Sequence, residues 1–139
     1  EKDIFVNIVV PKDLLTAAKE VRESAYTPFS GFKVGAALLS QTGQINVGAN
    51  VENSSYGLTR CAEQSAILTM ASSGARGFSV IVIYTDTDAP TTPCGACRQI
   101  LFEFSPKAEV FCVASSGRIL HTLVSELLPN GFRLSTQSP

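Results

Sequence analysis

Two short cysteine motifs constrain the fold of this chain more than any other feature of its sequence. The first motif is Cys61–Glu63 (Cys-Ala-Glu), and the second is Pro93–Cys97 (Pro-Cys-Gly-Ala-Cys). The first cysteines of the two motifs, Cys61 and Cys94, are 33 positions apart. Each motif lies at the start of a segment predicted to be a helix. Cys94 and Cys97 are three residues apart and share one helix face, and Cys61 can join them only if the two helix N-termini meet. The sequence therefore predicts a fold in which two helices begin side by side.

Three thiols at helix N-termini are well suited to bind zinc. A helix N-terminus carries unpaired amide donors and partial positive charge, which lower the pKa of a thiol and stabilise its thiolate. Three protein ligands leave a fourth position for water, and zinc-bound water ionises near neutral pH to a hydroxide that attacks electron-poor carbon. We predict one Zn²⁺ per subunit, with Cys61, Cys94 and Cys97 as ligands and Glu63 as the catalytic residue that moves protons.

Two other interpretations of the cysteines remain open. Cys112 could be the fourth ligand of a closed structural zinc site, although it lies in the apolar segment Val110–Val113, where a buried free cysteine is ordinary. Alternatively, Cys94 and Cys97 could form a redox pair, with Cys61 unrelated to them. Neither interpretation gives Glu63 a role.

Composition limits the class of protein and of ligand. The 139 residues are 45% hydrophobic and 17% charged, which is typical of one folded domain, here residues 1–139 with an N-terminal extension over 1–10. The net charge of −1 and the dispersed basic residues argue against nucleic acid or an anionic membrane as partner and favour a small substrate. No apolar run approaches the roughly 20 residues of a membrane span, and four cysteines suit a reducing compartment, so we expect a cytoplasmic protein.

The apolar periodicity predicts alternating strands and helices. Helices are expected over 12–25, 60–73 and from 93 to about 104, with one helical turn over 125–128. Strands are expected over 34–39, 45–51, 78–84, 110–114 and 119–122, with a polar loop over 52–59. The segment Phe78–Tyr84 is almost continuously apolar, which is typical of a strand covered on both faces. We predict a three-layer α/β/α domain with a mixed, mostly five-stranded sheet.

The chain resembles the zinc-dependent deaminases, and among them the small homotetrameric cytidine deaminases. A His or Cys two residues before a glutamate, followed by Pro-Cys-x-x-Cys, is the signature of the zinc deaminases. The segments Phe32–Ala37, Asn50–Asn53 and Ser55–Gly57 add to the resemblance, which runs from about Leu14 to Phe132. In having cysteine as the first ligand, the chain resembles the branch of this family that acts on free nucleosides.

This resemblance implies a reaction. The expected activity is hydrolytic deamination of cytidine and deoxycytidine to uridine and deoxyuridine plus ammonia, by zinc-bound hydroxide with Glu63 as proton shuttle, in pyrimidine salvage. The nearest alternative is a deaminase of a modified cytosine nucleoside, of the blasticidin type. A non-catalytic structural zinc module is a further alternative, for which Glu63 would be unnecessary.

The resemblance also assigns substrate contacts to Phe32, Asn50, Glu52, Tyr56, Ala62 and Phe132. Asn50 and Glu52 would bind the ribose hydroxyls, Phe32 would pack against the nucleoside, and the Ala62 amide would bind the pyrimidine 2-oxo group. A carboxylate at position 52 also has a physical reason, since it accepts hydrogen bonds from hydroxyls and repels a 5′-phosphate. Phe132 would come from a neighbouring subunit of a homotetramer and complete its active site. Without the resemblance, Asn50 could instead be a turn residue, and Phe32 and Phe132 could be core residues.

One position departs from the common family pattern. Many members have arginine after Cys-Ala-Glu, whereas this chain has Gln64. Three thiolates and Zn²⁺ sum to −1, so we expect Arg98 or Arg60, together with the helix dipoles, to supply the missing positive charge.

Overall fold

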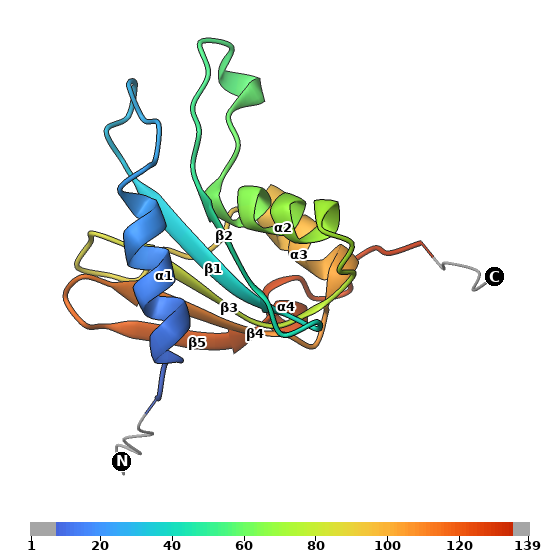
Figure 1. The fold of residues 1–139 in the computed structure, drawn as a ribbon. Coiled ribbons are helices and arrows are strands. Elements are labelled where there is room, and N and C mark those ends of the chain that lie inside the picture. Colours follow the sequence, from blue (N-terminus) through green and yellow to red (C-terminus); the bar gives the residue numbers. More distant parts are fainter. Residues whose placement is uncertain (1–7, 135–139) are drawn as a thin grey trace.

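The fold is built on one five-stranded sheet with the strand order β2-β1-β3-β4-β5 (Figure 1). In the computed structural model, which describes residues 8–134, the strands are β1 (Val34–Ser40), β2 (Ile45–Ala49), β3 (Phe78–Thr85), β4 (Glu109–Ala114) and β5 (Ile119–Leu123). β3 and β4 are parallel, and the other three neighbouring pairs are antiparallel. The predicted mixed sheet of five strands is confirmed.

Helices cover both faces of the sheet (Figure 1). α1 (Lys12–Arg22) packs on one face, while α2 (Ala62–Ser72), α3 (Gly95–Phe104) and the short α4 (Val124–Leu127) pack on the other. Between β3 and β4 the chain crosses over through α3, as parallel strands require. The predicted three-layer α/β/α arrangement is therefore confirmed.

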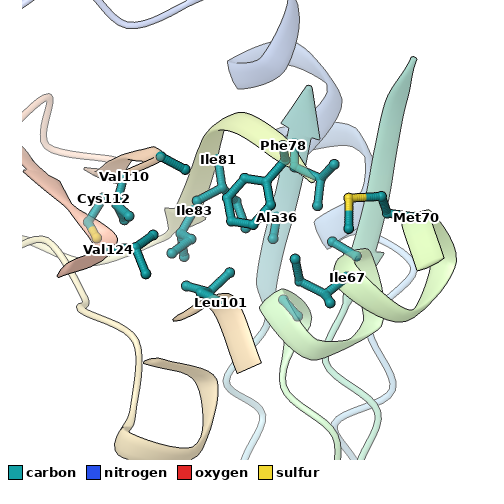
Figure 2. Packing of buried hydrophobic residues seen from close by; sticks show 14 of the residues in the cluster. Ala36, Ile67, Met70, Phe78, Ile81, Ile83, Leu101, Val110, Cys112 and Val124 are labelled. Carbon is teal, nitrogen blue, oxygen red and sulfur yellow. The ribbon is translucent and has the colours of Figure 1, made fainter. Parts of the chain in front are cut away.

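The sheet separates two clusters of buried side chains. Along β3, Ile81 and Ile83 point toward α2 and α3, whereas Val80 and Val82 point toward α1. Figure 2 shows the first of these clusters, in which Leu101 of α3 lies beside the two isoleucines. Burying an aliphatic side chain completely stabilises a fold by about 1.5–3 kcal/mol. The nearly unbroken apolar sequence of β3 is explained, because both faces of this central strand are covered.

Two glycines bring the helices against the sheet on its opposite faces. A Cβ atom at Gly35 of β1 would overlap the Ala18 carbonyl of α1, and one at Gly48 of β2 would overlap the backbone of α2 at Ala62 and Ala66. Helix backbone thus touches strand backbone at both places. This close contact fixes where α2, which begins next to Cys61, lies on the sheet.

Several element boundaries differ from the sequence prediction, for one shared reason. α1 ends at Arg22 instead of residue 25, and β2 ends at Ala49 instead of residue 51. Tyr26 and Val51 instead form an isolated bridge, and Val51 forms a second one with Arg60, which delays the start of α2 to Ala62. Long-range pairing of these segments overrides local propensity. The predicted loop over 52–59 contains a single 3₁₀ turn, η1 (Tyr56–Leu58).

The expected N-terminal extension over 1–10 falls largely on residues 1–7, which lie outside the part that the structure describes, as do residues 135–139. The division into one domain therefore stays a prediction. Within residues 8–134, no helix has the length and apolar character needed to cross a membrane.

Candidate active site

The N-termini of α2 and α3 meet, and three cysteine sulfurs meet with them. Cys61 immediately precedes α2 and Cys94 immediately precedes α3, both with extended backbone, while Cys97 lies in the first turn of α3. The three Sγ atoms all lie within 4.8 Å of one another, and those of Cys94 and Cys97 are 3.4 Å apart. Two sulfurs bound tetrahedrally at the usual zinc–sulfur distance are about 3.8 Å apart. The convergence predicted from the sequence is confirmed, and the three thiols form a group that could hold a metal ion.

The fourth cysteine lies elsewhere. Cys112 is completely buried in β4, within the hydrophobic cluster that Figure 2 shows, and does not belong to the group of three. Burial raises the pKa of the Cys112 thiol to about 12. A neutral thiol of this kind is a core residue. The position of Cys112 thus speaks against a closed site with four cysteine ligands.

The thiols of the group differ in acidity because of their hydrogen bonds. The hydrogen bond from Cys97 lowers the pKa of Cys61 to about 7, and the nearby charge of Arg60 acts in the same direction. The hydrogen bond to Cys61, followed by burial, raises the pKa of Cys97. Of these two thiols, Cys61 is therefore the one that ionises near neutral pH.

Glu63 lies at the second position of α2, beside these sulfurs, and its side chain is only 5% exposed. Burial raises the pKa of the Glu63 carboxyl above its ordinary value. A carboxyl with a raised pKa binds a proton more readily than an ordinary glutamate does, which suits proton transfer. The environment of Glu63 suits a general acid and base.

The residue after it, Gln64, is also buried and faces the cysteines. Its Nε2 donates a hydrogen bond to the Sγ of Cys97, at 3.5 Å. The guanidinium of Arg98, in contrast, donates to the carbonyls of Pro93 and Leu127 and to the Thr92 hydroxyl. Of the two arginines expected to balance the thiolates, Arg98 therefore donates no hydrogen bond to them within residues 8–134, whereas the charge of Arg60 lowers the pKa of Cys61. A neutral amide occupies the place next to Cys97.

A pocket of about 200 Å³ opens at the two helix N-termini. Of the residues predicted from the sequence, it is lined by Phe32, Asn50, Cys61, Ala62, Glu63 and Cys94. The other lining residues are Val34, Thr59, Ile83, Thr91 and Thr92. Sequence reasoning missed the threonines, although Thr91 and Thr92 directly precede the second cysteine motif. The structure brings the cysteine group and a cavity for a small molecule together.

Three of the residues predicted to contact substrate do not line this pocket. The carboxylate of Glu52 instead accepts hydrogen bonds from the Phe29 and Ser30 amides. Tyr56 is 75% exposed, and its ring meets that of Phe29 edge to face with centroids 5.7 Å apart. Phe132 is 70% exposed, and its carbonyl accepts a hydrogen bond from Gln99. Asn50 does line the pocket, and its side chain bonds the backbone at Phe32 and Val34.

Known proteins are similar to this chain over most of its length. The family model of the cytidine and deoxycytidylate deaminase zinc-binding region matches residues 10–113. A cytidine deaminase from Halalkalibacterium halodurans is 47% identical over 120 residues, which cover 86% of this chain and 91% of that protein. The crystal structure of cytidine deaminase from Burkholderia pseudomallei has a TM-score of 0.85 at 42% identity and covers 89% of this chain and 100% of its own. A blasticidin-S deaminase from Bacillus cereus is 32% identical over 104 residues, 69% of this chain and 74% of that protein.

Proposed function

Because this chain belongs to the cytidine and deoxycytidylate deaminase family, we propose that it hydrolyses the 4-amino group of cytidine and deoxycytidine, giving uridine, deoxyuridine and ammonia. The observation that carries the proposal is the meeting of three cysteine sulfurs, a buried glutamate and a small pocket at two helix N-termini. The protein is a zinc-dependent hydrolytic deaminase.

Cys61, Cys94 and Cys97 hold the metal. Zinc, when bound there, lowers the pKa of a water molecule and makes it a nucleophile near neutral pH. Glu63 takes a proton from the attacking water and delivers it to ring N3, so that C4 becomes more electrophilic. Glu63 then passes the second proton to the 4-amino group, which leaves as ammonia. The raised pKa of Glu63 and its place beside the cysteines support this role.

The pocket lining supports a free nucleoside as substrate. Phe32 offers an aromatic face, and the Ala62 amide at the start of α2, which has no partner within the helix, could donate to the 2-oxo group. Among residues 8–134, the lining contains no lysine, arginine or histidine that would bind a phosphate. Glu52 adds negative charge close to the loop that carries Phe32, as its hydrogen bonds to Phe29 and Ser30 indicate. The phosphate of a nucleotide would be repelled by the Glu52 carboxylate, and no cationic side chain of the described lining would bind it.

Glu63→Gln tests the catalytic role. The variant should fold and bind zinc, because Glu63 is not a ligand, but should lose more than 99% of turnover, since general acid–base catalysis contributes about 10²–10⁴-fold. The measurement is the loss of cytidine ultraviolet absorbance, with zinc content determined on the same sample. Glu103→Gln, a matched change of an exposed glutamate on α3, should retain full activity. An active Glu63→Gln variant would remove Glu63 from the mechanism.

The same assay decides the substrate. Loss of absorbance with cytidine, but not with cytidine monophosphate or with zinc-stripped protein, is the expected result. The similarity to blasticidin-S deaminase makes blasticidin S the necessary comparison, and the higher identity to cytidine deaminases favours cytidine. Turnover of blasticidin S alone would reverse the assignment, and turnover of neither by zinc-loaded, folded protein would support a structural zinc module.

A homotetramer that completes each active site with Phe132 of a neighbouring subunit is part of this proposal. Large apolar side chains lie exposed on the segments that leave the sheet, among them Phe29, Tyr56, Leu58, Phe132 and Leu134. Figure 1 shows that the segment between β2 and α2, which carries η1, extends away from the sheet. Exposed apolar side chains can be covered when subunits associate. An interface there would cover these side chains in the assembled enzyme.

A reducing compartment agrees with this site, because its three thiols must stay reduced to bind zinc. All four cysteines are free in the structure. We therefore place the enzyme in the cytoplasm, in pyrimidine salvage. Fractionation of cells that produce the protein would test the location.

A further inference from the structure

We propose that Ser30 is a positioning residue for the nucleoside, because its hydroxyl connects the Glu52 carboxylate to the backbone of Phe32. The inference rests on the proposed roles of Glu52 and Phe32 in binding substrate. Ser30 itself is exposed, does not line the pocket and lies outside the cysteine motifs. Its importance follows from two hydrogen bonds.

The backbone first brings the two segments together. Tyr26 donates its amide to the Asn50 carbonyl at 3.0 Å, and Glu52 donates its amide to the Tyr26 carbonyl at 2.9 Å. The segment after β2 therefore runs beside the start of the loop between α1 and β1. Gly31, with φ of +67°, completes a turn in this loop through a hydrogen bond to the Thr27 carbonyl. The turn places Ser30 within hydrogen-bonding distance of the Glu52 carboxylate.

The Glu52 carboxylate then holds the turn. Its Oε1 accepts hydrogen bonds from the amides of Phe29, at 2.9 Å, and Ser30, at 3.1 Å. Its Oε2 accepts the hydroxyl of Ser30. The hydrogen bond from the Ser30 side chain is the main cause that lowers the pKa of Glu52, so the carboxylate stays ionised.

Ser30 continues the connection to Phe32. Its Oγ accepts the Phe32 amide at 3.0 Å, while the Phe32 carbonyl accepts a hydrogen bond from the Asn50 side chain at 2.7 Å. Both peptide groups next to the Phe32 side chain are thus fixed, one by Asn50 directly and one by Glu52 through Ser30. The position of the aromatic ring that lines the pocket therefore depends on both hydrogen bonds.

This arrangement also determines what Glu52 has left to offer. An ionised carboxylate provides about four acceptor sites, and the turn uses three of them. The free site is on Oε2, whose orientation the Ser30 hydroxyl sets. One serine therefore positions both the acceptor for a sugar hydroxyl and the ring at the pocket.

Ser30→Ala should raise the KM for cytidine about tenfold and change kcat less than twofold, because a hydrogen bond to a charged group is lost outside the reacting centre. Ser30→Thr retains a hydroxyl and should bring KM back to within about twofold of the original. The melting temperature should hardly change, since the lost bond is at the surface. Ser116→Ala is the matched control: it removes an exposed hydroxyl that bonds the Asp88 carbonyl in another turn, and it should leave KM unchanged.

A double variant separates positioning from a general loop effect. In a Glu52→Gln background, Ser30→Ala should raise KM by less than about twofold, because Ser30 acts through the carboxylate. The inference would be overturned if the effects of the two substitutions on KM multiplied fully. An unchanged KM in Ser30→Ala, or a KM in Ser30→Thr as high as in Ser30→Ala, would also overturn it.

Hydrogen exchange tests the connection without substrate. The Phe32 amide should exchange at least tenfold faster in Ser30→Ala than in the original protein, and Ser116→Ala should leave it unchanged. Unchanged Phe32 exchange in Ser30→Ala refutes the connection even if the enzyme deaminates cytidine. Faster exchange in a protein that does not deaminate cytidine would instead locate the failure in the proposed function.

Discussion

At the scale of single residues, the chemistry of the cysteines depends on where the fold puts them. Cys61 precedes a helix and receives a hydrogen bond from Cys97, so its pKa falls to about 7. Cys112 points into the core from β4, and burial raises its pKa to about 12. The thiolate is the reactive form of cysteine. The same type of side chain is therefore a proposed metal ligand in one place and an unreactive core residue in the other.

This difference predicts selective alkylation of the metal-free protein. At pH 8, iodoacetamide should modify Cys61 at least 100-fold faster than Cys112, because about nine tenths of Cys61 and almost none of Cys112 is ionised at that pH. Peptide mass spectrometry after short exposure measures both rates. Zinc should suppress the modification of Cys61. Equal rates at the two positions would contradict the assignment of Cys112 to the core.

At the scale of elements, the site depends on how closely α2 lies on β2. Gly48 leaves no room for a side chain, since a Cβ atom there would overlap backbone atoms of Ala62 and Ala66. Ala62 lies between Cys61, a proposed metal ligand, and Glu63. Any shift of α2 away from the sheet would therefore move both of these functional side chains relative to α3.

Gly48→Ala should consequently reduce the free energy of unfolding by about 1–3 kcal/mol, as overpacking of a core does, and should also weaken zinc retention. Thermal unfolding and metal content after dialysis against a chelator measure the two effects. Gly57→Ala is the matched control, because a Cβ atom at Gly57 would meet nothing within 4 Å. If the two variants retained zinc equally well, the contact at Gly48 would not position the site.

The elements themselves were largely predictable from the sequence. The apolar pattern of β3 and the positions of Cys94 and Cys97 are local signals, and both led to the correct structure. The end of α1 at Arg22 was not predictable, because it is set by pairing between Tyr26 and Val51, which are distant in the sequence. A local sequence pattern does not indicate which distant residue a segment will pair with.

The candidate site was predictable to a similar extent. The three cysteines were identified by their spacing and chemistry, so their convergence was predictable. The hydrogen bonds between Glu52 and the turn at Ser30 join segments 22 positions apart and have no periodic signature. Gln64 was noticed only as a departure from a pattern, and its hydrogen bond to Cys97 required the packing of α2 against α3.

At the scale of the whole molecule, the proposed homotetramer would give a role to aromatic side chains that one chain leaves exposed. Phe132 and Tyr56 are among the most exposed large apolar residues within 8–134. Phe132 also lies outside the pocket lining of its own chain. In the proposed homotetramer this residue acts on a neighbouring site.

Mixing two impaired variants tests that exchange. Phe132→Ala should lose most activity because its sites lack the neighbouring ring, and Glu63→Gln should lose it because its sites lack the proton carrier. Unfolding and refolding the two together should restore a substantial fraction of turnover, since Glu63→Gln subunits supply Phe132 to sites with an intact Glu63. Sedimentation measures assembly in each sample. Full activity in a monomer would refute the proposal, and so would a mixture no more active than its parts.

The proposed division of the site between separate stretches of chain has an evolutionary consequence. The metal ligands and Glu63 belong to the beginnings of α2 and α3, whereas the turn at Ser30 and its partner Glu52 belong to the connections that follow α1 and β2. Substitutions in those connections reach the sugar end of the pocket without touching the atoms that carry the reaction. Substrate selectivity and catalytic activity can thus evolve separately. Substitutions can change which nucleosides the enzyme binds, while selection keeps the residues that carry out the reaction unchanged.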